Sequence, residues 1–174
     1  QEALEALEEE KERFSSNPFL EQLFNKQKAV LLVQLNRAKE AEPLWAELFE
    51  LSGDRRAGLS LVAAAMGRED METALRVADE MIGTNTKDRA HYLCLYYKAM
   101  VLQTQKSDEA PEAIREATAQ FNQLDAGKMG PPLRMLRASV RAMAGQYDAA
   151  LSDLDSFENL LRDEEESEEK TEAL

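Results

Sequence analysis

Residues 36–51, NRAKEAEPLWAELFEL, constrain the fold more than any other stretch of this sequence. Small and apolar residues recur there every three or four positions: Ala38, Ala41, Leu44, Trp45, Leu48 and Leu51. That spacing puts them on one side of an α-helix, which must pack against a neighbour to leave water. Ala41 lies in the middle of this side, where an alanine lets another helix approach closely. The stretch therefore predicts a helix built for close packing.

The composition extends this prediction to the whole chain. Gly and Pro number only 7 and 5, aromatic residues make up 6 %, and Ala, Leu, Glu, Lys and Arg dominate, which favours an all-α fold. The length of 174 residues is enough for a domain with a substantial core. Every apolar run is shorter than the roughly 20 residues of a membrane span, so we expect no membrane insertion.

Turn-forming and capping residues divide the chain into nine expected helices. Asn17-Pro18, Ser52-Gly53, Asp54, Gly67 and Gly145 are among these signals, together with loops over 83–86 and 126–132. The expected helices are 1–15, 18–35, 36–51, 54–66, 69–82, 87–106, a segment capped by Ser107-Asp108 that carries Ala113 to Phe121, 133–144 and 147–160. Residues 163–174 are mostly glutamate and form an acidic tail that we expect to be disordered.

Four alanines suggest that these helices repeat. Ala41, Ala74, Ala113 and Ala150 are separated by 33, 39 and 37 residues. Residues 144–151, AGQYDAAL, resemble the turn and second-helix start of the tetratricopeptide repeat, G-x-Y-x-x-A-L, and residues 36–51 resemble its second helix. The family period is about 34 residues. In this frame Ala138 takes the small position of a first helix.

The resemblance implies a right-handed α-solenoid of about four antiparallel helix pairs over residues 17–162, with residues 1–16 as an N-terminal acidic capping helix. The sequence departs from the family in three ways. No repeat ends in the usual proline, the third pair has a longer turn, and Ala65 and Thr104 stand where an aromatic residue is expected. The alternative fold is an irregular helical bundle whose spacing is accidental.

Charge is distributed unevenly between the expected first and second helices. The net charge of −13 argues against binding of nucleic acid by the chain as a whole. The first helices, 23–36, 54–67, 87–106 and 131–144, carry +9 together, whereas the second helices, 37–52, 68–83, 107–127 and 146–163, carry −13. We therefore expect an acidic, amphipathic peptide or helix of another protein as partner. The alternative is that short helices carry basic residues by chance.

First helices line the concave groove in tetratricopeptide arrays, so the resemblance also implies partner-binding residues. These are Lys26, Val30, Arg56, Leu59, Ala63, Tyr96, Lys98, Arg134, Met135, Ser139 and Met143. One subtype of the family grips the terminal carboxylate of chaperone tails. Val30 and Ser60 stand at the positions of its clamp asparagines, so we do not expect that specificity.

No arrangement of residues predicts an enzyme, a metal site or a cofactor. His91 is the only histidine, which rules out a two-histidine metal site and a Ser-His-Asp triad, and we expect it at the surface or as a cap. Cys94 lies among apolar residues and predicts a buried, inert thiol. Asp153 and Asp155 are two positions apart, so they point to different sides of a helix and form no carboxylate pair.

These observations predict a protein-binding adaptor or assembly-scaffold subunit. Two alternatives stay open: a constitutive subunit that uses a side face, and a domain autoregulated by its acidic tail. The single cysteine predicts a cytoplasmic location. The absence of an initial methionine suggests a fragment of a longer protein, and nothing in the sequence indicates an oligomeric state.

Overall fold

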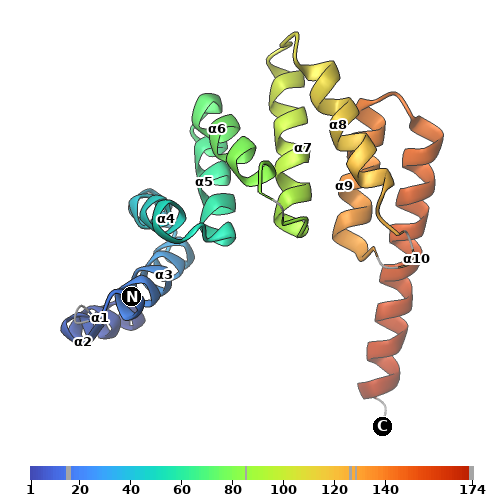
Figure 1. Cartoon of the computed structure of the whole chain (residues 1–174). Coiled ribbons are helices and arrows are strands. Elements are labelled where there is room, and N and C mark those ends of the chain that lie inside the picture. The colour runs from blue at the N-terminus through green and yellow to red at the C-terminus, as the bar shows by residue number, and fades with distance from the viewer. Residues whose placement is uncertain (15–16, 85, 126, 128, 173–174) are drawn as a thin grey trace. The chain divides into compact units, whose positions relative to one another are not determined.

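The computed structural model describes residues 1–14, 17–84, 86–125, 127 and 129–172, and its side-chain description excludes residues 160, 161 and 163–172. The described chain is helical, and helices that are neighbours in sequence pack in pairs (Figure 1). It divides into two compact units, Gln1–Gly83 and Thr84–Leu174, which are described one at a time. The all-α class expected from the sequence is confirmed.

The first unit contains two helical hairpins. The first is α3 (Pro18–Gln34) with α4 (Ala38–Ser52), the second is α5 (Arg55–Gly67) with α6 (Met71–Ile82), and α4 packs against α5. Two short helices, α1 (Glu2–Glu9) and α2 (Lys11–Phe14), lie against α3, where the sequence predicts a single helix over 1–15. The expected break at Ser15-Ser16 lies outside the described residues.

The second unit also contains two hairpins. The first is α7 (Arg89–Thr104) with α8 (Ala110–Asn122), and the second is α9 (Pro131–Met143) with α10 (Tyr147–Glu172). Here α9 packs against both α7 and α8, so the two hairpins share a continuous core. That core includes Leu95, Phe121 and Val140, which are almost completely buried. The last turns of α10 coincide with the acidic tail, whose expected disorder stays a prediction.

Short polar side chains cap the helices, several of them at the positions expected from the sequence. The Asn17 side chain accepts a hydrogen bond from the Phe19 N–H at 2.9 Å, and Pro18 occupies the first helical position. The Asp54 carboxylate accepts from two backbone N–H groups at the start of α5, at 2.9 and 3.0 Å. At the end of α4, Gly53 adopts a left-handed φ of 63° that glycine tolerates without strain.

Several expected helix starts differ from the structure: the helices predicted from residues 36, 69 and 87 begin at Ala38, Met71 and Arg89, and two further starts also move. The predicted cap at Ser107-Asp108 lies before the start of α8, which begins at Ala110 with Glu109 as its N-cap, and the Ser107 hydroxyl accepts the Glu109 N–H at 3.2 Å. Helix α9 begins at Pro131 rather than at residue 133. Proline lacks an N–H, but the first turn of a helix has no acceptor for that N–H, so prolines are tolerated there.

All four hairpin turns share one backbone pattern. In each, the N–H of one residue donates to the carbonyl five positions earlier: Arg37 to Leu32, Asp70 to Ala65, Ser107 to Leu102 and Gln146 to Arg141, at 2.8 to 3.0 Å. The residue before each donor has a left-handed φ: Asn36 (60°), Glu69 (62°), Lys106 (53°) and Gly145 (73°). This closure satisfies carbonyls at the end of the first helix of each hairpin.

The four alanines of the predicted repeat occupy one structural position. Each is the fourth residue of the second helix of its hairpin, counting from Ala38, Met71, Ala110 and Tyr147. Their exposed fractions are 0, 2, 5 and 5 % for Ala41, Ala74, Ala113 and Ala150. The small side chain is therefore buried at the same point of each hairpin, where it permits close approach of helices.

Candidate protein-binding site

A pocket opens in the first unit between its two first helices, α3 and α5. Helix α4 packs against α3 and against α5, but no Cα atom of α3 lies within 8 Å of one in α5, and both helices are fully described. The space beside α4 forms a pocket of about 440 Å³, which we call the α3–α5 pocket. It is lined by Val33, Ala38, Lys39, Glu42, Trp45, Ser60, Ala63, Ala64, Gly67 and Arg68.

The interior of the α3–α5 pocket is apolar. Trp45 forms part of its wall from α4 and is only 5 % exposed, while Val33 of α3 is 48 % exposed. The buried indole N–H of Trp45 has no hydrogen-bond acceptor among the described residues. Such a wall favours an aliphatic or aromatic side chain of a ligand.

Charged groups surround this pocket. Arg68 pairs with Glu42 and, at 3.5 Å, with Asp70. Lys39 is exposed and has no ion-pair partner among the described side chains. The described rim therefore carries one cation that no internal carboxylate neutralises, which favours an anionic ligand group.

An ion pair holds α3 to the start of α5. The Lys26 ammonium lies 2.5 Å from the Asp54 carboxylate, and both side chains are partly buried. Burial alone would raise the pKa of Asp54, but hydrogen bonds from Lys26 and from the Ala57 and Arg56 N–H groups bring that pKa below its ordinary value. Asp54 thus caps α5 and fixes the position of α3.

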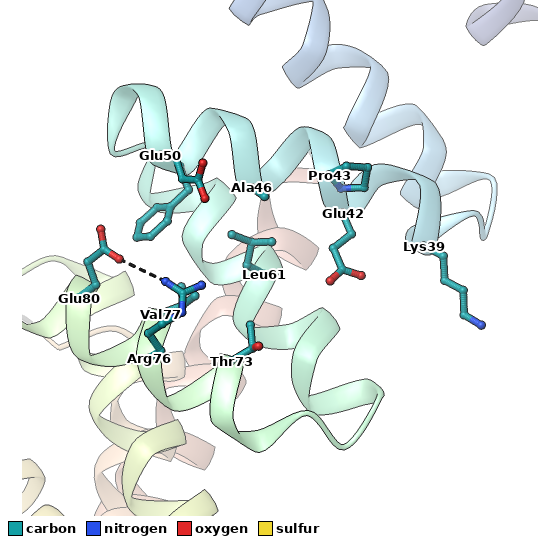
Figure 2. Close-up of a pocket in the computed structure, with 11 residues that line it drawn as sticks. Lys39, Glu42, Pro43, Ala46, Glu50, Leu61, Thr73, Arg76, Val77 and Glu80 are labelled. Carbon is teal, nitrogen blue, oxygen red and sulfur yellow. Dashed lines mark ion pairs between the residues drawn. The ribbon is translucent and has the colours of Figure 1, made fainter.

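A second pocket, of about 310 Å³, lies on the other side of α4, and we call it the α4–α6 pocket. Figure 2 shows Leu61 of α5 between the residues of α4 and those of α6. Arg76 and Glu80 of α6 pair at 3.8 Å, and Glu50 extends from α4 nearby (Figure 2). This pocket contains none of the predicted binding residues. Lys39 and Glu42 line both pockets.

The predicted groove residues of the first unit lie on α3 and α5: Lys26, Val30, Arg56, Leu59 and Ala63. Ala63 lines the α3–α5 pocket, and Val30, 38 % exposed, precedes Val33 by one helical turn. Arg56 is exposed and Leu59 is half-buried. The sequence predicted Trp45 as a core residue and not as part of a binding site. Its spacing in the helix indicates that the side chain is buried, but not that one edge of it lines a pocket.

The predicted groove residues of the second unit lie on α7 and α9: Tyr96, Lys98, Arg134, Met135, Ser139 and Met143. Met135 is 47 % exposed, and the Ser139 hydroxyl donates to its carbonyl at 3.0 Å. The Arg134 Nε donates to the Met129 carbonyl at 2.9 Å. Tyr96 and Lys98 are half-buried, and Met143 lines a pocket beside α8. Their role in binding stays a prediction.

A buried ion cluster accounts for two of the arginines that contribute to the positive charge of the first helices. The Asp153 carboxylate, 3 % exposed, accepts from Arg137 at 2.9 and 2.5 Å and from Arg141 at 2.8 Å. The Arg141 guanidinium also donates to the Asn122 side chain of α8 at 2.8 Å. These arginines hold helices together, so they are not available to a partner.

The structure corrects the expected position of His91. Its side chain is 2 % exposed, and its Nε2 lies 2.9 Å from the Gln120 side-chain oxygen on α8. Cys94 is fully buried, as expected. The described side chains form no group of three or more His, Cys, Asp or Glu residues that could hold a metal ion. No helix in the described ranges has the length and apolar character needed to cross a bilayer.

The chain matches no protein-family model, no curated protein and no solved structure in our comparisons.

Proposed function

We propose that this chain is a divergent tetratricopeptide-like α-solenoid that binds another protein, as an adaptor or as the scaffold of an assembly. Four hairpins with one turn pattern and a buried alanine at one position support the repeat. The right-handed stacking of the hairpins is part of the proposal. Support for the binding role comes from the α3–α5 pocket.

The observation that carries the proposed function is the separation of α3 from α5. Packed first helices would bury Val33 and Ala63, but both are exposed, next to the wall that Trp45 provides. Covering exposed apolar surface is worth about 25 cal/mol per Å². A pocket of this volume accepts one or two large side chains, which is how a peptide anchors itself in a groove.

The partner is an acidic, amphipathic peptide or helix. Its apolar side chains enter the α3–α5 pocket, and its carboxylates meet Lys39 beside the pocket and Arg56 on α5. Both cations are exposed and neither is paired within the described chain. Charges at the rim of an interface mainly set the association rate and its dependence on salt.

Affinity capture with matched variants tests this function. Ala63→Glu adds bulk and negative charge at an exposed pocket position, whereas Ala3→Glu makes the same change at an exposed position of α1. We expect proteins captured by wild type to be lost with Ala63→Glu and retained with Ala3→Glu. Charge reversal at Lys39 and Arg56 should weaken the same capture, most strongly at low salt. Identical capture by wild type and Ala63→Glu would overturn the proposal.

A further inference from the structure

Helix α10 exposes an apolar stripe that none of the described side chains of its unit covers. Tyr147, Leu151 and Leu154 are 66, 59 and 43 % exposed. Their spacing of four and three residues aligns them along one side of the helix. The opposite flank, with Ala150 and Asp153, is buried against α9.

The same positions of α8 are covered. Counted from the first residue of each helix, Tyr147, Leu151 and Leu154 correspond to Ala110, Ile114 and Ala117. Ala110 is 7 % exposed, Ala117 is 0 % exposed and Ile114 is half-buried. Within this unit α8 packs against both α7 and α9, whereas α9 is the helix that packs against α10 among the described residues. The stripe of α10 therefore occupies positions that are buried or half-buried one hairpin earlier.

Charge indicates what kind of helix fits this stripe. Asp148 and Asp155 are seven residues apart, so they lie on one flank of the helix, about 90° from the stripe. Glu158 continues the line of the stripe one turn beyond Leu154. All three carboxylates are exposed and have no ion-pair partner among the described side chains.

The helix that packs on the other flank of α10 shows the matching chemistry. Helix α9 contributes Arg137 and Arg141 to the Asp153 carboxylate. It also donates from Arg141 to Asn122 of α8. Within this unit, an acidic second helix is thus met by an arginine-bearing first helix.

From this geometry we infer that the Tyr147–Leu151–Leu154 stripe docks an amphipathic helix of another protein, one whose apolar side is flanked by Lys or Arg. The partner helix takes the place on α10 that α9 takes on α8. Its cations face Asp148, Asp155 and Glu158. This second surface lies in a different unit from the α3–α5 pocket and selects the opposite charge.

The test uses the full chain and a fluorescent, end-capped peptide of residues 131–144, the basic segment that covers α8. We expect saturable binding by anisotropy, weakened at least tenfold by Leu151→Glu. Leu51→Glu, at a leucine 65 % exposed on α4, is the matched control and should bind like wild type. Double charge reversal, Asp148→Lys with Asp155→Lys, should also abolish binding, and a peptide whose arginines are replaced by glutamate should restore it.

Each other outcome overturns the inference. Absence of binding to wild type excludes a docking site for a basic helix. Binding that Leu151→Glu leaves unchanged means that the peptide displaces α9 from its own place. A dimer of the unmodified chain in sedimentation, dissolved by Leu151→Glu, means that a second copy covers the stripe. Ala63→Glu should not alter peptide binding, so failure here and failure of the proposed function are distinguishable.

Discussion

Replacing Glu69 by glycine should make the protein more stable. Glu69 has a φ of 62° in the turn between α5 and α6, and its side chain is exposed and has no ion-pair partner among the described residues. A left-handed conformation costs an L-residue about 1–2 kcal/mol. Glycine removes that cost but loses about 0.5–1 kcal/mol more conformational entropy on folding. The expected net gain is about 0.5–1 kcal/mol.

The other hairpin turns provide an internal series for this prediction. Lys106→Gly should give a similar gain, since Lys106 has a φ of 53° and is exposed. Asn36→Gly should give less, because asparagine tolerates this conformation better than most residues. Gly145→Ala should lose about 1 kcal/mol by the same argument in reverse, since its φ is 73°.

Equilibrium urea unfolding of the full chain, followed by far-ultraviolet circular dichroism, measures these differences. The control is Gln27→Gly, at an exposed position inside α3, which should lose about 1 kcal/mol because glycine is a poor helix former. If Glu69→Gly and Lys106→Gly destabilise the protein as Gln27→Gly does, the left-handed residues of these turns are not strained and the reasoning is refuted.

Three further substitutions test the packing and the electrostatics. Gly58→Ala should cost about 1–2 kcal/mol in urea unfolding, since a Cβ there would collide with the buried Met81 sulfur while helix propensity offsets part of the strain. Asp153→Asn should cost about 3 kcal/mol or more in the same assay, because it leaves Arg137 buried without a counter-ion. Asp54→Asn should cost about 1 kcal/mol at pH 7. The folded pKa of Asp54 is lowered, so the stability difference between wild type and Asp54→Asn should persist above about pH 4 and vanish as the pH falls through that folded pKa. Urea titrations at several pH values measure this difference.

Local signals in the sequence predicted much of the helical framework. Asn17, Gly53 and Asp54 marked helix ends correctly, because a cap depends on one short side chain and its nearest backbone groups. The alanine spacing predicted a shared buried position, which the structure bears out for Ala41 and Ala150 alike. These features need no knowledge of how distant segments meet.

The left-handed residues of the hairpin turns were only partly predictable from the sequence. Asn36 and Gly145 are residues that favour a left-handed φ, but Glu69 and Lys106 adopt it without any such preference. The hydrogen bonds that close the hairpins overcome their local cost. Residue type alone therefore identifies some members of this series and not others.

Features that depend on pairs of distant residues could not be predicted. Asp153 and Arg137 are 16 positions apart, and nothing in either residue signals that they meet inside the protein. His91 was expected at the surface or as a helix cap, whereas its side chain is buried and its partner Gln120 belongs to another helix. The α3–α5 pocket depends on the separation of α3 from α5, and the residue pattern within either helix does not indicate how far apart the two helices lie.

Because Lys39 and Glu42 border the pockets on both sides of α4, ligands there should not bind independently. An anion that attracts Lys39 into one pocket withdraws it from the other, and a cation that competes for Glu42 loosens its pair with Arg68. By thermodynamic reciprocity, whatever the first ligand does to the affinity of the second, the second does equally to the first. One turn of a single helix can in this way let two ligands communicate without any rearrangement of the fold.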